Sequence, residues 1–341
     1  MKNTIKLIVG ESEKEIRIDL YLKNKKKELS RTRVKNLILK EKLKINNTLV
    51  KDPSKKISAG DNITFEIPEP KKASLKPYEY KLDIVHEDSD LIVINKNAGI
   101  SMHPSVGNYD NTIVNALMNY DKKLSTIGDE LRPGIVHRID KDTSGLIVIA
   151  KNNLSHENLS NQFANKTSKR EYVALVWGNI ENDKGSIEGN IGRHPKNRLQ
   201  NSVFLDEDAH KGKPAVTHFE VLERLGYVTL VRCTLETGRT HQIRVHMKHI
   251  GHTLFNDERY GGDKILKGTT FTKYKQFVDN CFKVLPRQAL HAKTLGFVHP
   301  TNNEWLSFSC DMPVDMSHCI EKWRGYSKHT HSGSYTHLRA H

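Results

Sequence analysis

A charged, turn-forming segment that leads directly into an apolar run is the feature that most constrains this chain. Residues 137–146 (HRIDKDTSGL) precede residues 146–150, which have the length and β-branched content of a buried strand. Because loops carry chemistry and buried strands hold it in place, we expect Asp140 on a fixed loop beside a sheet. Arg138 and Lys141 flank this carboxylate and favour its charged form. Asp140 is a candidate nucleophile or base, although most charged loops before strands are only solvated surface.

The length and charge of the chain narrow its class. Its 341 residues suffice for one large domain and a smaller one, and the net charge of +14 predicts an anionic partner, either nucleic acid or an anionic membrane surface. No apolar stretch approaches the ~20 residues that span a bilayer, and the N-terminus leads into no signal-peptide core, so we expect nucleic acid and no membrane. The cysteines form no Cys-x-x-Cys pair, which argues against a zinc ribbon or a disulfide scaffold and fits a cytoplasmic protein; they are Cys233, Cys281, Cys310 and Cys319.

Most of the positive charge lies near the N-terminus. Residues 1–76 contain 20 Lys and Arg against 10 Asp and Glu, so 20 − 10 = +10 of the total +14 falls there. Ser30 is a good N-cap for a helix whose apolar stripe is Val34, Leu37 and Ile38. Two short strands about an Asn46-Asn47 turn and a strand at 63–67 follow. Residues 15–68 therefore read as a compact basic unit of short helices followed by strands.

This N-terminal pattern resembles the alpha-L RNA-binding domain first seen in a small-subunit ribosomal protein. The likeness rests on the segments RIDLYL, SRTRVKNLI, KINN and AGDNITFEI in that order. It implies that the basic helix lies against the RNA backbone and makes its RNA-binding residues Ser30, Arg31, Arg33 and Lys35. The alternative is a merely solvated basic helix. Glu41 stands where that family usually has Gly, so the turn after the helix is expected to differ slightly.

Beyond this unit the pattern is that of an α+β protein. Strand-like runs such as 82–85 and 91–95 alternate with helical patterns at 111–119 and 154–163, which suggests a large mixed or antiparallel sheet. We predict an RNA-binding domain at 1–70, a proline-rich linker at 71–80 and a catalytic domain at 81–326. Residues 327–341 are rich in His, Ser and Thr without periodicity and are predicted to be a disordered tail.

Four ordered motifs make the larger part similar to the RluA family of pseudouridine synthases. HRIDKDTSG resembles the family's central motif, KREYVALVWG (169–178) its Tyr-bearing strand, GRTHQIRVHMKHIGH (238–252) its Arg-bearing helix and RQALHAKTLGFVHP (287–300) its closing segment. The resemblance implies isomerisation of uridine in RNA to pseudouridine, with no cofactor and no metal. A C–N glycosidic bond breaks, the uracil rotates while held, and a C–C bond forms from its carbon 5 to the ribose.

The resemblance also assigns residues to roles. Asp140 would be the catalytic carboxylate, as nucleophile or as base on the ribose, and Arg244 would pair with it. Tyr172 would stack on uracil and take part in proton movement. Arg138 would fill the space left by the extruded nucleotide, with His137 and Ile243 as further substrate-binding residues. The alternatives are a surface helix for Arg244 and ordinary core packing for Tyr172 and Ile243.

Other readings of the chain remain open at this level. A metal nuclease is a weak one, because His241, His246, His249 and His252 form no His-Glu-x-x-His pattern. A non-catalytic, ribosome-associated RNA-binding protein would account for the basic N-terminal domain alone.

In the RluA family, an N-terminal domain of this kind is typical of enzymes that modify large-subunit ribosomal RNA, so this RNA is the expected partner and transfer RNA the second choice. A monomer suffices, and no protein partner is required. Asn97 replaces the family's usual Pro before His103-Pro104, which affects loop stiffness.

Overall fold

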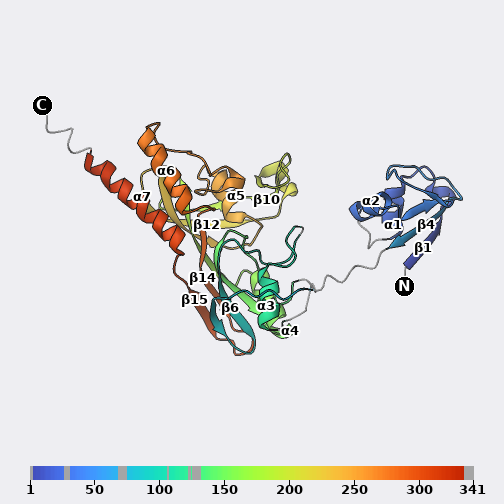
Figure 1. Cartoon of the computed structure of the whole chain (residues 1–341), viewed down its shortest axis with the longest axis horizontal. Coiled ribbons are helices and arrows are strands. Elements are labelled where there is room, and N and C mark those ends of the chain that lie inside the picture. Colours follow the sequence, from blue (N-terminus) through green and yellow to red (C-terminus); the bar gives the residue numbers. More distant parts are fainter. Residues whose placement is uncertain are drawn as a thin grey trace. The chain divides into compact units, whose positions relative to one another are not determined.

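The chain folds into two compact units, Met1–Ser74 and Leu75–His341. The computed structural model describes residues 3–26, 31–67, 75–105, 107–121, 124 and 132–333 (Figure 1). Each unit has its own hydrophobic core. Residues 71–74 of the predicted linker lie outside the described residues. Farther along the same segment, the Tyr78 N–H donates to the Asn115 carbonyl, so its described part packs on the larger unit.

The N-terminal unit is a four-stranded antiparallel sheet packed on two helices. Its elements are β1 (Asn3–Ile8), α1 (Ile18–Lys25), α2 (Arg31–Leu39), β2 (Leu43–Ile45), β3 (Thr48–Leu49) and β4 (Asn62–Ile67), and the strand order is β1-β4-β2-β3. The predicted stripe Val34, Leu37 and Ile38 is buried in α2 and packs with Ile18 and Phe65. The helix and strands predicted from 30 to 67 are therefore present.

Glu41 closes α2 in a left-handed conformation. Its φ is 57°, a value that costs an L-residue of this kind roughly 1–2 kcal/mol and that glycine adopts freely. The backbone N–H groups of Glu41 and Lys42 donate to the carbonyls of Ile38 and Leu37, which ends the helix. The turn keeps the geometry that favours glycine although the side chain is Glu.

The larger unit is built on a mixed nine-stranded sheet. Its strands are β5 (Ile84–Glu87), β6 (Leu91–Lys96), β7 (Ser144–Ala150), β8 (Lys169–Trp177), β9 (Lys184–Glu188), β12 (Val216–Arg224), β13 (Val228–Leu235), β14 (Leu290–Val298) and β15 (Trp305–Ser309). The order is β5-β6-β7-β14-β8-β13-β12-β9, with β15 paired to β14. In this sheet, as far as the structure describes it, the β7–β14 pair is parallel and the other strand pairs are antiparallel. This arrangement confirms the predicted α+β class with a large mixed sheet. A two-stranded sheet of β10 (Asn190–Arg193) and β11 (Asn201–Phe204) stands apart.

Helices cover both faces of this sheet. α3 (Ile113–Tyr120) and α5 (Gln242–His249) pack on one face, where Ile147, Tyr172 and Val231 meet Leu117 and Met247. α6 (Thr272–Val284) and α7 (Val314–Gly333) cover the opposite face of β8 and β13, and α4 (Asn153–Ala164) covers that of β6 and β7. Every residue of β7 is buried, as the apolar run predicts. The loop before β7 therefore starts from a rigid layer.

Gly145 explains the glycine of the central motif. Its φ is 123°, and a Cβ there would lie 2.2 Å from the carbonyl oxygen of Ala292 on β14. Any side chain at this position would push the parallel β7–β14 pair apart. The central motif thus ends with the residue that lets β7 join the sheet.

The C-terminal helix is longer than predicted. α7 continues to Gly333, so the prediction of a disordered tail is wrong for residues 327–333, and residues 334–341 lie outside the described residues. Trp323 is fully buried, and its ring packs edge-on against Trp177 and Phe277, which anchors the helix. A packed helix extends through polar residues that have no periodicity of their own. Within the described part of the chain, no helix combines the length and apolar character of a membrane span.

Candidate active site

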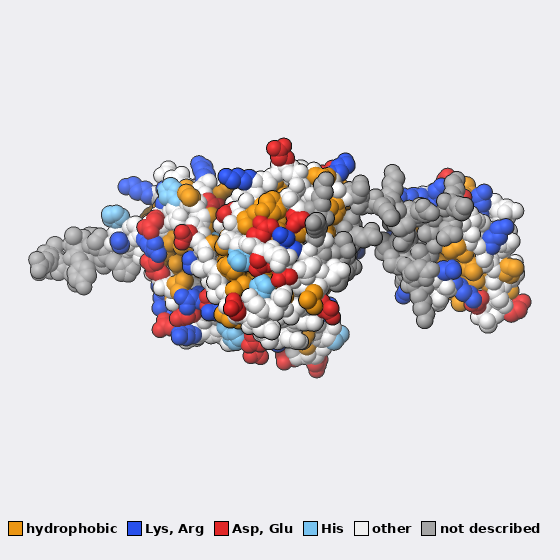
Figure 2. All heavy atoms as spheres, turned by 90° about the horizontal axis from the view of Figure 1, so that it is seen from below, with side chains coloured by type: hydrophobic (Ala, Val, Ile, Leu, Met, Phe, Trp, Pro, Cys, Tyr) orange, Lys and Arg blue, Asp and Glu red, His pale blue; other side chains and the backbone are white. Residues whose placement is uncertain are grey.

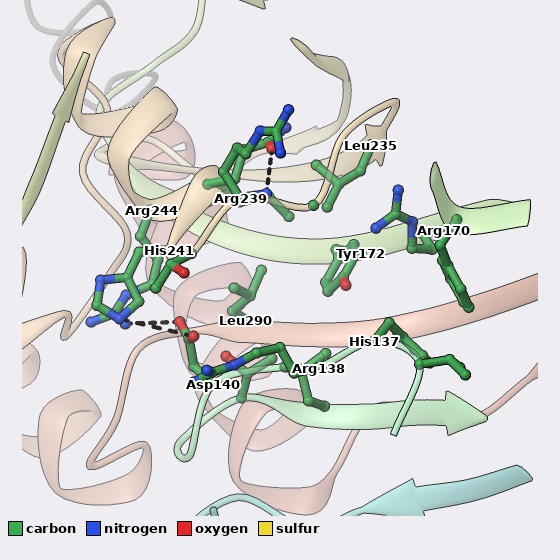
Figure 3. Close-up of a pocket in the computed structure, with 18 of the residues that line it drawn as sticks. His137, Arg138, Asp140, Arg170, Tyr172, Leu235, Arg239, His241, Arg244 and Leu290 are labelled. Carbon is green, nitrogen blue, oxygen red and sulfur yellow. Dashed lines mark hydrogen bonds and ion pairs between the residues drawn. The ribbon is translucent and has the colours of Figure 1, made fainter. Parts of the chain in front are cut away.

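A cavity of about 340 Å³ opens between the loop before β7, strand β8 and the start of α5 (Figure 3). Asp140, Tyr172, Ile243 and Arg244 line this cavity, so the structure brings four of the predicted site residues together. His137 and Arg138 also line it. Segments far apart in the sequence thus form one pocket with a carboxylate, four guanidinium groups and an aromatic hydroxyl in its walls.

The loop that carries Asp140 is held by its backbone. The Nζ of Lys96, which is only 2% exposed, donates to the carbonyl of Lys141 at 2.9 Å and to two carbonyls of its own loop. The Nη1 of Arg287 donates to the carbonyl of Asp142 at 3.0 Å, and Arg287 is itself held by Asp315. These contacts explain how a charged loop is fixed, and they use the backbone of Lys141 and Asp142 rather than their side chains.

Arg244 forms ion pairs with two carboxylates. Its Nη1 donates to Asp140 Oδ2 at 2.9 Å, while Nε and Nη2 donate to the two oxygens of Asp257 at 2.7 and 2.8 Å. Burial alone would lower the pKa of Arg244, but Asp257 and Asp140 raise the pKa above its ordinary value. Asp257 is fully buried and orients the guanidinium. Sequence reasoning missed Asp257, which lies in an irregular loop with no motif of its own.

His241 lies on the other side of the Asp140 carboxylate. It precedes α5 with a φ of 59°, and its Nε2 is 3.9 Å from Asp140 Oδ1. Its Nδ1 lies 2.8 Å from the hydroxyl of Tyr260, which also accepts the N–H of Asn201. Burial lowers the pKa of His241 to about 4, so the ring is neutral at pH 7. If Tyr260 donates to Nδ1, the ring proton is on Nε2 and faces Asp140.

Tyr172 and Arg170 line the pocket from β8. Two residues apart on a strand, they point to the same face of the sheet. Both are buried, and burial raises the pKa of Tyr172 while the charge of Arg170 opposes that shift. Ile243 and Leu290 supply apolar wall nearby. Sequence reasoning missed Arg170, although its spacing from Tyr172 is a signal that could have found it.

His137 and Arg138 point in different directions. The Nε2 of His137 accepts the backbone N–H of Val148 at 3.0 Å, and the ring stacks on Phe163 with centroids 4.4 Å apart, so His137 ties the loop to β7 and α4. Arg138 is exposed, and its Nη1 lies 3.3 Å from Nε2 of His103. Arg138 is therefore exposed at the pocket, whereas His137 is held in place.

The predicted RNA-binding residues of the N-terminal unit fall in or beside α2. Arg31 and Arg33 belong to this helix, Lys35 is exposed on it, and Ser30 lies outside the described residues. Lys and Arg side chains stand out on the described surface of this unit in Figure 2. Of the basic residues predicted on α2, Lys35 is therefore shown to face solvent.

Two groups of side chains contain residue types that bind metals. The imidazole of His246 lies with Nδ1 2.9 Å from Thr217 Oγ1 and Nε2 3.3 Å from the Gly189 carbonyl, and His252 contacts the Trp177 carbonyl. Within the described ranges, the one group with metal-ligand spacing is that of Asp88, Asp90 and His299. The four histidines behind the metal-nuclease alternative therefore do not form such a group.

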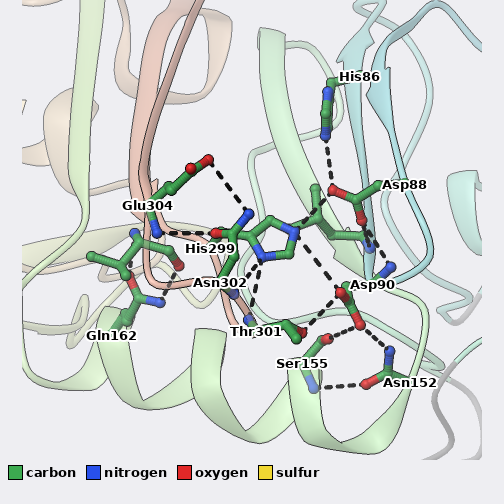
Figure 4. Close-up of polar contacts among 12 residues, drawn as sticks. His86, Asp88, Asp90, Asn152, Ser155, Gln162, His299, Thr301, Asn302 and Glu304 are labelled. Carbon is green, nitrogen blue, oxygen red and sulfur yellow. Dashed lines mark hydrogen bonds and ion pairs between the residues drawn. The ribbon is translucent and has the colours of Figure 1, made fainter.

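The side chains of Asp88, Asp90 and His299 form hydrogen bonds and ion pairs within the protein (Figure 4). The Nε2 of His299 lies 2.9 Å from Asp88 Oδ2, and its Nδ1 accepts the N–H of Thr301 at 3.2 Å, so both ring nitrogens are used. Burial would raise the pKa of Asp88, but hydrogen bonds from His86, His299 and backbone N–H groups lower it to about 2. This network joins the β5–β6 turn to the β14–β15 hairpin.

The neutral buried histidines predict a pH-dependent stability. Burial lowers the pKa of both His241 and His291 from 6.5 to about 4. As the pH falls, each imidazole takes up a proton in the unfolded chain before it does so in the folded chain. The free energy of unfolding therefore keeps its full value above pH 6.5 and decreases as the pH falls toward 4. We expect the melting temperature, followed by circular dichroism, to drop across this range and to drop less steeply in His291→Gln. A melting temperature that stays constant over the same range would contradict this assignment.

Two family models and several known proteins are similar to this chain. Residues 90–249 match the family model described as RNA pseudouridylate synthase, and residues 16–63 match the S4 domain. The chain is 44% identical over 94% of its length to the "Uncharacterized RNA pseudouridine synthase YlyB" of Bacillus subtilis (strain 168), of which it covers 99%. It is 43% identical over 88% of its length to the "Ribosomal large subunit pseudouridine synthase D" of Zymomonas mobilis, covering 91% of that protein.

A solved structure agrees as well. The structure titled "Human RNA Pseudouridylate Synthase Domain Containing 1" aligns with 74% of this chain and 90% of its own, with a TM-score of 0.52 and 25% identity. Fold, pocket and relatives together define an RNA pseudouridine synthase. The chain belongs to the RluA family of these enzymes and carries an S4 domain at its N-terminus.

Proposed function

We propose that this enzyme converts uridine to pseudouridine in large-subunit ribosomal RNA, with Asp140 as its catalytic carboxylate. The observation that carries the proposal is the Asp140–Arg244 pair, 2.9 Å long, in the wall of the pocket. Support for the RNA class comes from relatives named ribosomal large subunit pseudouridine synthase D, such as that of Escherichia coli O157:H7, which is 37% identical over 95% of this chain.

Asp140 acts on the ribose of the bound uridine. Its side chain is 18% exposed, so the carboxylate meets substrate while remaining fixed by Arg244. Attack on C1′, or removal of a ribose proton, lets the C1′–N1 bond break with its electron pair on uracil. When carbon 5 then bonds to C1′, the ring loses the proton on carbon 5 and gains one on N1. Reactant and product are isomers, and no group leaves the enzyme.

Tyr172 holds the uracil in the pocket, and Arg138 takes the place of the extruded nucleotide in the RNA. The ring of Tyr172 forms one wall of the pocket, where it stacks on uracil, and its hydroxyl takes part in the proton transfer. Arg138, exposed at the rim, enters the space left when the nucleotide is extruded, at a cost of a few kcal/mol to the RNA. His137 fixes the loop that carries Asp140, and Ile243 forms part of the apolar wall against which the base lies.

The N-terminal unit supplies affinity rather than chemistry. Basic side chains beside an RNA backbone release counterions and bind without reading sequence. Arg31, Arg33 and Lys35 on α2 are the residues we assign to this contact, with Ser30 next to them in sequence.

Mapping of pseudouridine with carbodiimide and reverse transcription tests both parts of the proposal. The purified enzyme is incubated with unmodified large-subunit ribosomal RNA and, in parallel, with transfer RNA. We expect stops that depend on the enzyme in the ribosomal RNA and none in transfer RNA. Modification of transfer RNA alone would overturn the choice of RNA, and unchanged uridines in both RNAs would overturn the enzyme assignment.

A further inference from the structure

Arg170 is a buried cation for which the proposed mechanism has no use. Arg170 is only 6% exposed, its Nε is buried without a hydrogen-bond partner, and no ion pair holds the guanidinium within the described part of the chain. Its guanidinium carbon lies 5.4 Å from the ring centroid of Phe163 on α4. Burial of an unpaired charge costs several kcal/mol, and a charge of this kind in a pocket is a candidate for contact with a ligand.

The position of Arg170 identifies that ligand as part of the substrate. Arg170 lines the same pocket as Asp140 and lies two residues before Tyr172 on one face of β8 (Figure 3). Arg244 is held by Asp140 and Asp257, the Nε of Arg239 donates to the Pro214 carbonyl, and Arg138 is exposed and contacts His103. A nucleotide that places its ribose at Asp140 directs its base toward the Tyr172 side of the pocket. Among the arginines described in this pocket, Arg170 is therefore the one that combines burial with a guanidinium Nε that has no partner, and it lies beside Tyr172.

We propose that Arg170 binds an oxygen of the uracil ring and stabilises the negative charge that the ring carries after the glycosidic bond breaks. The proposal rests on the function proposed above. In that step the C1′–N1 electron pair stays with uracil and spreads onto its O2 and O4 oxygens, and it returns when the C5–C1′ bond forms. A fixed donor in a dry pocket stabilises such a developing charge more than it stabilises the neutral base. Phe163, stacked below the guanidinium, keeps it in place.

Gly238 leaves the room that this guanidinium needs. A Cβ at Gly238 would lie 2.6 Å from Arg170 Nη1, and its backbone conformation is one that alanine adopts. Gly238→Ala therefore moves the charge without removing it. Arg170→Met removes the charge while an unbranched side chain fills the space.

The test compares single-turnover rate, RNA affinity and melting temperature of the wild-type enzyme with those of the two variants. We expect Arg170→Met to lower the rate at saturating enzyme about 100-fold, the effect of losing one oxyanion donor, with little change in RNA affinity. Gly238→Ala should lower the rate less. The melting temperature of Arg170→Met should stay the same or rise, because an unpaired buried charge is gone.

Each other outcome overturns the proposal. Weaker RNA binding with a smaller salt dependence and an unchanged rate would assign Arg170 to a phosphate group instead. A lower melting temperature that accounts for the lost activity would make Arg170 structural, and an unchanged rate and affinity would leave it without a substrate contact. Since wild-type enzyme is measured alongside, failure of the proposed function appears as an inactive wild type, whereas failure of this inference appears as an active Arg170→Met.

Discussion

Asp140→Asn is expected to abolish pseudouridine formation and to leave the fold and the RNA affinity intact. The amide keeps the size of the side chain but is neither a nucleophile nor a base, so the single-turnover rate should fall by more than about 100-fold. Arg244 retains its two hydrogen bonds to Asp257, and the substitution therefore leaves no buried charge without a partner. Removal of one negative charge does not weaken the binding of a polyanion.

Three measurements on Asp140→Asn separate chemistry from structure. Thermal unfolding and RNA binding by filter retention should both match the wild type, while the carbodiimide assay detects no product. Asp142→Asn is the matched control, because Asp142 also lies in this loop but contacts Arg287 through its backbone carbonyl alone. It should keep wild-type activity. An Asp140→Asn enzyme that turns over within a few-fold of the wild type would remove Asp140 from the mechanism.

The site was predictable where its residues form contiguous motifs. Asp140 precedes a strand that is buried throughout, and Tyr172 begins the buried run of its own strand, so local pattern and tertiary position agree. Arg244 lies on a short helix that begins right after the His241 turn. The local sequence pattern predicts the strand or helix that carries each residue. The resemblance to the RluA family predicts that these strands and helices meet at one site.

Residues that act through tertiary contacts were not predictable. Asp257 meets Arg244 only because the chain after α5 folds back on it, and the three carbonyl partners of Lys96 come from two loops. No period or spacing in the sequence encodes such pairs. The extension of α7 was missed for the same reason, since the packing of Trp323 against β8 stabilises it rather than its own polar composition.

Arg244→Met is expected to reduce both stability and activity, in contrast to Asp140→Asn. It leaves the carboxylate of Asp257, which is fully buried, without a counter-charge, and such a loss costs about 3–5 kcal/mol. Denaturant unfolding should show this decrease in the free energy of unfolding. Pseudouridine formation should fall by more than about 100-fold even at temperatures where the variant is folded, because Asp140 loses the donor that fixes it.

A second substitution separates the two losses. In the double variant Arg244→Met with Asp257→Asn, an uncharged amide replaces the buried carboxylate, so most of the lost free energy of unfolding should return. The activity should stay low, because no donor positions Asp140. Arg244→Lys tests the geometry, because the donors of one ammonium nitrogen cannot reproduce the planar fork that reaches Asp257 and Asp140 from three separate nitrogens. It should fold better than Arg244→Met and remain impaired. If Arg244→Met unfolds like the wild type and turns over at its rate, the bridge between Asp257 and Asp140 has no part in catalysis.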